Sequence, residues 1–252
     1  MGPMPDLEVL YCDNHVLAVV KPAGLPVVPD ESGDRSLLEL AKAWVKREYD
    51  KPGEVFLGVV HRLDRPVQGV VVFGRTSKGA SRLSAAWRDG RVVKRYRAWS
   101  PSTAELPTRE GTLALWQLKD PTRNFVTVLG VAPIDAGEDD RDHRAGGNGA
   151  LREGGGAPSR PHPDAQRAVT RWKVTRQDAR GTFLELEPVT GRKHQLRLAC
   201  RHLGWPLAGD LKYGAQEPLP DKSIGLCATE LEVPHPTRHE RLRWRVAPPW
   251  KE

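Results

Sequence analysis

Short apolar blocks recur along the chain, and their spacing predicts strands more often than helices. Blocks at 9–11 and 17–20 flank Asp13-Asn14, which predicts a hairpin. Further strands are predicted at 55–60, 70–73, 92–99, 112–118, 125–129, 168–175 and 182–187, with a last β-rich stretch at 224–246. Because several strands follow one another in hairpin succession, we expect an α+β fold with a mixed, mainly antiparallel sheet and flanking helices.

Three segments have apolar residues at helical spacing. The first, 36–49, begins at Ser36, and the second, 77–88, begins at Ser77, so both serines are predicted N-caps. The third, 192–203, ends at Gly204. We expect each helix to bury its apolar stripe against the sheet.

Composition changes sharply between residues 131 and 166, where Gly, Pro, Asp, Arg and Ala dominate. Such a segment buries too little apolar surface to offset its ordering entropy, roughly 1–2 kcal/mol per residue for the backbone. We therefore predict a single domain over residues 7–246, interrupted by a flexible insertion at 131–166.

The chain has 252 residues, a formal net charge of +7 and three cysteines far apart in the sequence. The odd, dispersed cysteines fit reduced thiols in a cytoplasmic compartment better than a disulfide framework. No apolar run is long enough for a membrane span, and the N-terminus lacks the pattern of a signal peptide. The positive charge is only weak support for binding of nucleic acid.

The most informative candidate site is the loop at residues 61–69, which lies between two predicted buried strands. It reads His-Arg-Leu-Asp-Arg-Pro-Val-Gln-Gly and places one carboxylate, Asp64, among basic side chains. Two core strands can hold such a carboxylate rigidly, and the flanking cations favour its ionised form. An ordinary Asp–Arg pair in a turn is the alternative for this loop taken alone.

Two further stretches carry basic residues in a regular pattern. On the helix predicted at 192–203, His194, Arg197 and Arg201 share the face opposite the apolar stripe, as either an anion-binding or a solvated basic face. On the strand at 92–99, Tyr96 lies between basic residues, an arrangement that suits base stacking or ordinary packing against the sheet.

Taken together and in this order, the motifs resemble those of the RluA-type RNA pseudouridine synthases. The matching stretches are 21–27 (Lys-Pro-Ala-Gly-Leu-Pro-Val), 61–65 with Gly69, Lys94 with Tyr96, 190–197 (Thr-Gly-Arg-Lys-His-Gln-Leu-Arg) and 204–214 (Gly-Trp-Pro-Leu-Ala-Gly-Asp-Leu-Lys-Tyr-Gly). The resemblance covers about residues 7–130 and 167–235. It implies the pseudouridine synthase fold, with a bent sheet and a central basic cleft.

The resemblance also implies roles for individual residues. Asp64 corresponds to the catalytic aspartate, Arg197 to the basic residue that pairs with it, and Tyr96 to the tyrosine that packs against the target base. The resemblance also implies RNA, either rRNA or tRNA, as the partner, with no metal or organic cofactor. The substrate-binding residues it suggests are Arg62, Arg65, Arg192, Lys193 and His194.

Asp64 could act in two ways, and the sequence leaves both open. It could attack C1′ of the uridine as a nucleophile, or remove the C2′ proton to give a glycal. In either case the uridine must be flipped out of its RNA, and basic surface that binds the flanking phosphates can supply the energy. Besides the residues above, Arg95, Arg97 and Arg201 are expected on that surface.

This chain departs from the family pattern after Arg65, where Val67-Gln68 replaces the usual Thr-Ser pair. That change keeps one alternative open, a catalytically impaired RNA-binding protein on the same fold. A zinc hydrolase using Cys227, His235 and His239 is disfavoured, because Pro234 and Pro236 break any helix that could align the imidazoles. An ordinary glycosidase would need a second opposing carboxylate, and none is singled out.

The remaining expectations concern assembly. We expect a monomer without an obligate protein partner and without an appended S4-type RNA-binding domain. The central expectation is that the carboxylate of Asp64 faces the guanidinium of Arg197 across a pocket that admits a flipped nucleotide.

Overall fold

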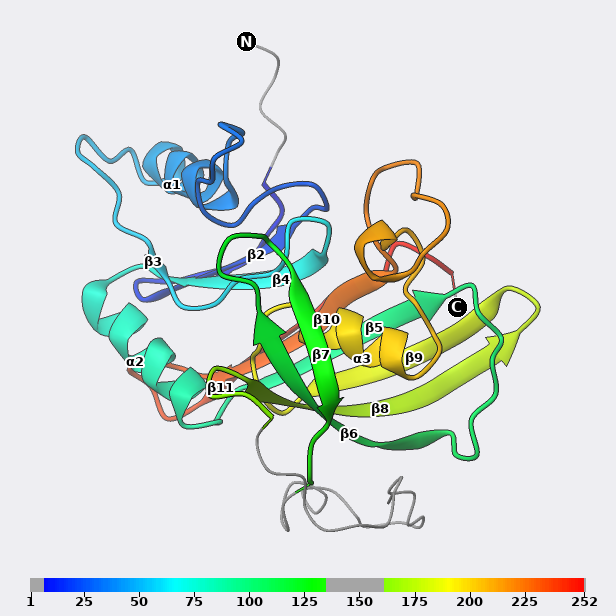
Figure 1. The fold of residues 1–252 in the computed structure, drawn as a ribbon. Coiled ribbons are helices and arrows are strands. Elements are labelled where there is room, and N and C mark those ends of the chain that lie inside the picture. The colour runs from blue at the N-terminus through cyan, green and yellow to red at the C-terminus, as the bar shows by residue number, and fades with distance from the viewer. Residues whose placement is uncertain (1–6, 135–160, 252) are drawn as a thin grey trace. The chain divides into compact units, whose positions relative to one another are not determined.

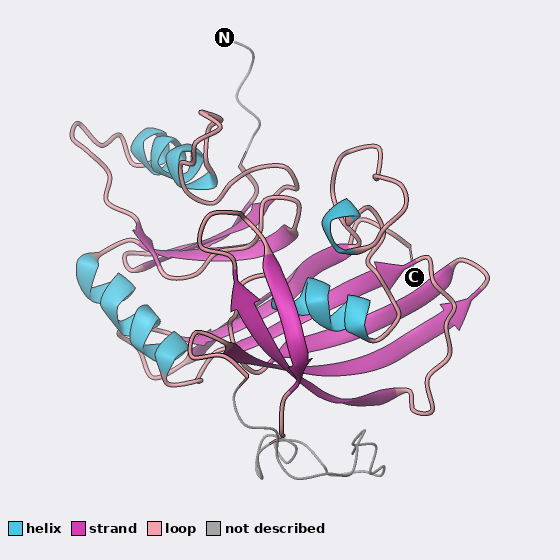
Figure 2. Ribbon diagram, viewed as in Figure 1, coloured by secondary structure: helices cyan, strands magenta, loops and turns pink. Residues whose placement is uncertain are grey.

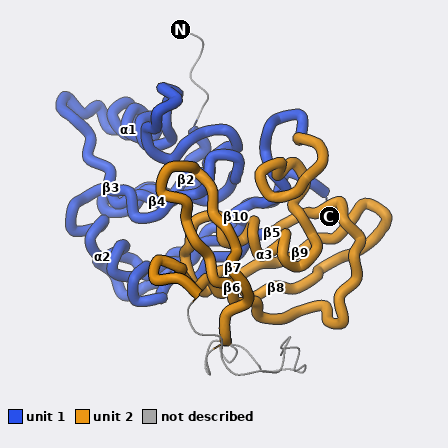
Figure 3. Tube along the Cα trace, viewed as in Figure 1, with its two compact units in different colours: residues 1–96, 219–251 blue, residues 97–218, 252 orange. Residues whose placement is uncertain are grey.

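The computed structural model describes residues 7–134 and 161–251. They divide into two compact units (Figure 3), and the single domain predicted over residues 7–246 stays a prediction. Unit 1 contains the chain up to Tyr96 and again from Leu219 to Lys251, and unit 2 contains Arg97–Pro218. Most of the predicted insertion, residues 135–160, lies outside the described residues, so its predicted flexibility stays a prediction.

Strand is more abundant than helix in both units (Figure 2). The elements follow the chain in this order (Figure 1): β1 (Val9–Cys12), β2 (Val16–Lys21), α1 (Leu37–Glu48), β3 (Gly58–Val59), β4 (Gln68–Gly74), α2 (Ser77–Arg88), β5 (Val93–Ser100), β6 (Glu110–Lys119), β7 (Val126–Val131), β8 (Gln166–Asp178), β9 (Gly181–Pro188), α3 (Gln195–His202), the 3-10 helix η1 (Leu211–Tyr213), β10 (Leu226–Pro234) and β11 (Arg241–Arg245). Residues 131 and 166, the predicted limits of the insertion, are the last residue of β7 and the first residue of β8.

Unit 1 is built on the strand order β1-β2-β4-β10, with β11 paired to β10 and β3 paired to β4. The pair β4–β10 is parallel, whereas β1–β2, β2–β4, β3–β4 and β10–β11 are antiparallel. The predicted N-terminal hairpin is confirmed. The core of this unit forms where β4 and β10 pack against α2, through Val70, Val72, Leu83, Ala86 and Leu231.

Unit 2 contains the antiparallel order β9-β8-β6-β7. The helix α3 contacts β8 and β9, and Leu198 of α3 packs with Val126 and Tyr213 in one apolar cluster. On the described residues, the mixed and mainly antiparallel pairing predicted from the sequence is confirmed.

The starts of the three helices can be compared with the N-caps and first residues predicted from the sequence. The predicted cap Ser36 is confirmed, because its hydroxyl accepts the N–H of Glu39 while the Glu39 carboxylate accepts the N–H of Ser36. The predicted cap Ser77 is wrong, because Thr76 precedes it and accepts the N–H of Gly79 at 3.0 Å. The predicted helix 192–203 is also wrong at its start, since α3 begins only at Gln195.

The strand predicted at 55–60 is reduced to the two residues of β3, and the reason lies in β4. One edge of β4 pairs along its whole length with β2. Its other edge is shared, because β3 pairs with residues 73–74 while β10 pairs with residues 68–69. Gly58 stands opposite Gly74, the last residue of β4, so residues 55–57 have no part of β4 to pair with. The chain from Val60 to Val67 leaves the ladder as a loop, and that loop carries Asp64.

Candidate active site

The loop that carries Asp64 is attached to unit 1 through its backbone. The N–H of Val67 donates to the carbonyl of Asp64 at 3.0 Å, which closes a turn. The carbonyl of Arg65 accepts the N–H of Gly24 at 2.9 Å, and that of Pro66 accepts the N–H of Ile224 at 3.4 Å. Asp64 itself is partly buried, so its carboxylate is held on a fixed loop at the protein surface.

Lys21, the last residue of β2, holds the same loop from within. It is fully buried, and its Nζ donates to the carbonyls of Pro22, Leu25 and Arg65 at 2.9, 2.7 and 3.0 Å. Burial lowers the pKa of Lys21 to about 7, while the nearby Asp64 carboxylate raises it and Arg65 lowers it further. The three carbonyls use all three N–H groups of an ammonium, so this geometry favours the charged form and places a cation near Asp64.

His61 attaches the start of the loop to the open part of the β4 edge. Its Nε2 accepts the backbone N–H of Val72 at 3.0 Å, and its ring stacks on Trp87 of α2 with centroids 4.6 Å apart. Burial lowers the pKa of His61 to about 3, and the positive charge of Lys94 lowers it further. His61 is therefore a neutral imidazole that carries its proton on Nδ1 and satisfies a strand N–H that has no strand partner there.

Tyr96 lies in unit 1 with Asp64 and interacts with it electrostatically. Burial raises the pKa of its phenol above the usual range, and the negative charge of Asp64 raises it further, as does Cys227 once its thiol is ionised. The Tyr96 hydroxyl is consequently protonated at neutral pH. Of the residues predicted to be catalytic, the structure brings Asp64 and Tyr96 together within one unit.

The two predicted substrate-binding arginines of the loop differ in their surroundings. Arg62 is exposed and forms no ion pair or hydrogen bond within residues 7–134 and 161–251. Arg65 is held inside unit 1, because its Nε donates to the carbonyl of Gly24 at 2.9 Å and its guanidinium pairs with Asp34 and, at 3.6 Å, with Asp30. Arg62 thus has the freer guanidinium.

Other arginines expected on the RNA surface are neutralised by neighbouring glutamates. In unit 1, Arg95 pairs with Glu230 at 2.7 Å. In unit 2, Arg97 pairs with Glu185 at 3.2 Å. Arg201 is exposed. Because an ion-paired guanidinium has part of its charge already compensated, Arg95 and Arg97 are weaker candidates for phosphate contacts.

Arg197 lies in unit 2 and is buried, although the helical pattern allowed a solvated face. Its Nε and Nη2 donate to the two oxygens of Asp210 at 2.7 and 2.6 Å, and the two side chains are 6% and 1% exposed. A bidentate pair of this kind fixes the plane of the guanidinium as well as its position. The sequence contained Asp210 within the matching stretch 204–214, but nothing local in that stretch showed that it binds Arg197.

The loop just before α3 is attached to β8 by hydrogen bonds of the Gln195 side chain. The amide of Gln195 contacts Val169 and Thr170 of β8 and also accepts the N–H of Arg192. Arg192 and Lys193 are exposed, as a phosphate contact would require. His194 is buried, adopts a left-handed backbone with φ 56°, and places Nδ1 2.6 Å from the hydroxyl of Tyr213.

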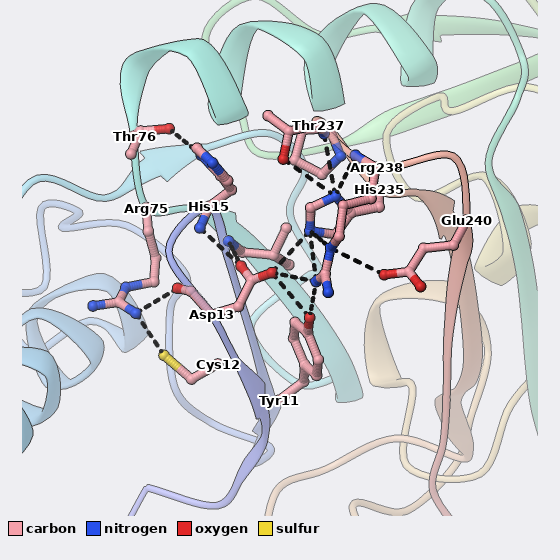
Figure 4. Close-up of polar contacts among 12 residues, drawn as sticks. Tyr11, Cys12, Asp13, His15, Arg75, Thr76, His235, Thr237, Arg238 and Glu240 are labelled. Carbon is pink, nitrogen blue, oxygen red and sulfur yellow. Dashed lines mark hydrogen bonds and ion pairs between the residues drawn. The ribbon is translucent and has the colours of Figure 1, made fainter.

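The zinc alternative finds no support in the described parts of the chain, which contain no group of three or more His, Cys, Asp or Glu able to hold a metal. His235 instead contacts Asp13, with Nε2 2.8 Å from the carboxylate, in a polar cluster that also includes Tyr11 and Arg238 (Figure 4). All three cysteines are free thiols. Among the described helices, none combines the length and apolarity that crossing a bilayer requires.

Comparison with known proteins identifies the family. The sequence profile described as RNA pseudouridylate synthase matches residues 15–202, which is most of the chain. The chain belongs to this family. The match confirms the expectation drawn from the motifs, and the RluA type is supported by the Haemophilus influenzae "Dual-specificity RNA pseudouridine synthase RluA", which is 28% identical over 96% of this chain and 93% of that protein.

Other relatives in the family differ in length. The Bacillus subtilis "Uncharacterized RNA pseudouridine synthase YhcT" is 30% identical over 94% of this chain and 67% of its own length. The chain spans only 41% of the Arabidopsis thaliana "RNA pseudouridine synthase 4, mitochondrial", to which it is 32% identical. Among solved structures, "Human RNA Pseudouridylate Synthase Domain Containing 4" superposes with a TM-score of 0.70 at 24% identity, over 96% of this chain and 88% of that one. This likeness confirms the predicted pseudouridine synthase fold.

Proposed function

We propose that this protein converts specific uridines of structured RNA, either rRNA or tRNA, to pseudouridine, with Asp64 as the catalytic residue. The observation that carries the proposal is the loop of unit 1, where Lys21 and His61 hold the backbone around Asp64 and the Asp64 charge acts on Tyr96. The name of the Yersinia pestis relative, "Ribosomal large subunit pseudouridine synthase D", favours rRNA as the first substrate to test. The protein acts as a monomer in the cytoplasm and needs no protein partner.

The reaction breaks the N1–C1′ bond, turns the uracil within the site and forms a C5–C1′ bond. The proton on C5 is lost and N1 gains one, so atoms balance without a cofactor. Asp64 begins the reaction by attacking C1′ or by removing the C2′ proton, and either route needs it ionised. The buried ammonium of Lys21 favours that state, and we propose that Arg197 of unit 2 pairs with Asp64 as well.

Tyr96 is proposed to hold the detached uracil by stacking. A phenol whose pKa lies above the usual range is a poor acceptor for the C5 proton, because the base form is scarcely populated at neutral pH. We therefore assign the final deprotonation to water or another group. The exposed Arg62 is proposed to fill the gap that the flipped nucleotide leaves in the RNA, with Arg65, Arg192 and Lys193 as the other RNA contacts.

The test is tritium release from RNA labelled with [5-³H]uridine, measured together with RNA binding. Asp64→Asn keeps the shape of the side chain and should lower turnover by about a thousandfold while RNA affinity stays unchanged. The matched control is Asp89→Asn, an exposed carboxylate of the same unit, which should behave as wild type. Tyr96→Phe should keep turnover within an order of magnitude, since the ring remains.

Two results would contradict the proposal. Near-normal tritium release by Asp64→Asn would remove Asp64 from the chemistry. A wild-type protein that binds RNA but releases no tritium from rRNA or tRNA would instead be the impaired RNA-binding protein.

A further inference from the structure

Within unit 2, the guanidinium of Arg197 is held on two sides. Asp210 binds its edge through two hydrogen bonds of 2.7 and 2.6 Å, and the guanidinium lies over the ring of Tyr213, with Cζ 4.9 Å from the ring centroid. All three side chains are at most 6% exposed. Hydrogen bonds along one edge leave the guanidinium free to tilt about that edge, and an aromatic ring packed beside it restricts the tilt.

The local backbone explains why Asp210 and Tyr213 act on the same arginine. Asp210 precedes η1 and Tyr213 is its last residue, so they are the first and last residues of one turn. A hydrogen bond of 3.0 Å from the N–H of Tyr213 to the carbonyl of Asp210 closes this turn. Residues three apart in a 3-10 helix lie on one side of it. The turn therefore presents a carboxylate and an aromatic ring to Arg197 together.

Tyr213 is itself fixed by two hydrogen bonds at its hydroxyl. The backbone N–H of Val126 donates to this oxygen at 3.2 Å, and Nδ1 of His194 lies 2.6 Å away. The hydroxyl of Tyr213 therefore accepts the N–H of Val126 and shares a second hydrogen bond with Nδ1 of His194. The Nδ1 atom of His194 is thus hydrogen-bonded to Tyr213, and the His194 ring is buried.

We propose that Tyr213 is a positioning residue whose ring sets the orientation of the Arg197 guanidinium, and that His194 acts through Tyr213 rather than by binding RNA. The proposal rests on the function proposed above, in which Arg197 supports the ionised Asp64. If Arg197 is to pair with the Asp64 carboxylate, the plane of its guanidinium must be fixed closely. Asp210 and Tyr213 are the two neighbours that fix this plane. The role assigned to His194 replaces the substrate contact expected from the sequence.

The experiment separates the ring of Tyr213 from its hydroxyl. Tyr213→Leu removes the face contact and should lower kcat about 30-fold, with KM for RNA within threefold, because a misplaced group of this kind costs up to about a hundredfold. Tyr213→Phe keeps the ring and should retain kcat within threefold. The control Tyr11→Phe also deletes a hydrogen-bonded tyrosine hydroxyl, at Asp13 in unit 1, and should leave kcat unchanged. His194→Gln should leave RNA affinity within twofold of wild type.

A double substitution tests whether Tyr213 acts through Arg197. In an Arg197→Lys background, which lacks the planar fork, Tyr213→Leu should lower kcat by less than threefold further, whereas a general structural defect would lower it about 30-fold again. Unchanged kcat in Tyr213→Leu, or a large loss of RNA affinity in His194→Gln, overturns the proposal. Should Tyr213→Leu fail to fold, Tyr213→Phe decides alone, and a loss of kcat beyond threefold overturns it. Full turnover in Arg197→Met would count against the proposed function instead.

Discussion

A substitution at Gly69 tests whether close packing of β4 against β10 fixes the end of the Asp64 loop. It follows the loop as the second residue of β4 and has φ +127°, on the side of the Ramachandran map that L side chains rarely adopt. In the parallel pair β4–β10 it stands opposite Ala228. A Cβ at Gly69 would lie 2.3 Å from the carbonyl oxygen of Ala228 and 2.7 Å from its nitrogen.

These distances set the expected cost of Gly69→Ala. Relieving a 2.3 Å contact requires the two strands to separate by about 1 Å, which takes a ladder hydrogen bond of normal length beyond its useful range. Losing two such bonds costs about 2 kcal/mol. The positive φ adds about 1–2 kcal/mol. The free energy of unfolding should therefore fall by about 3–4 kcal/mol.

Gly24→Ala is the matched control, because Gly24 also has positive φ, +80°, but a Cβ added there would meet no atom within 4 Å. It should lose only the conformational part, about 1–2 kcal/mol. Urea unfolding of the two variants and wild type, followed by tryptophan fluorescence, measures the difference. Equal losses in the two variants would refute the reasoning, since backbone conformation alone would then account for Gly69.

Two more predictions concern the buried polar groups of unit 1. Lys21→Met removes three hydrogen bonds from a buried ammonium to backbone carbonyls and should lower the free energy of unfolding by about 3 kcal/mol. The exposed Lys51→Met should cost less than about 0.5 kcal/mol, and similar values for both variants in urea unfolding would contradict the role of Lys21. Burial opposes the ionisation of Asp13, but hydrogen bonds from His235 and from the N–H groups of His15 and Val16 lower its pKa below the usual 3.8. Because the folded pKa is the lower one, the stabilisation is complete above about pH 5 and is lost as pH falls below the unfolded value near 4. The stability difference between wild type and Asp13→Asn should thus shrink from pH 5 to pH 2 in urea unfolding, and a constant difference would argue against the cluster in Figure 4 as its cause.

Local sequence determined most elements of this protein and the family to which it belongs. The hairpin β1–β2 and the cap at Ser36 depend on neighbouring residues, so they could be predicted from the chain alone. The order of the motifs around Asp64, Tyr96 and Arg197 identified an RNA pseudouridylate synthase, because each motif is a short continuous stretch.

Tertiary structure decided what depends on residues far apart in the chain. The strand predicted at 55–60 shortened to β3 because Gly58 stands opposite Gly74, where β4 ends, and because the His61 side chain, not a further strand residue, accepts the N–H of Val72. The start of α3 moved to Gln195 because the Gln195 side chain binds β8 and the loop before the helix. The polar face of α3 became partly buried because Asp210 neutralises Arg197, and a helical pattern contains the spacing of charges but not the partner that allows a charge to be buried.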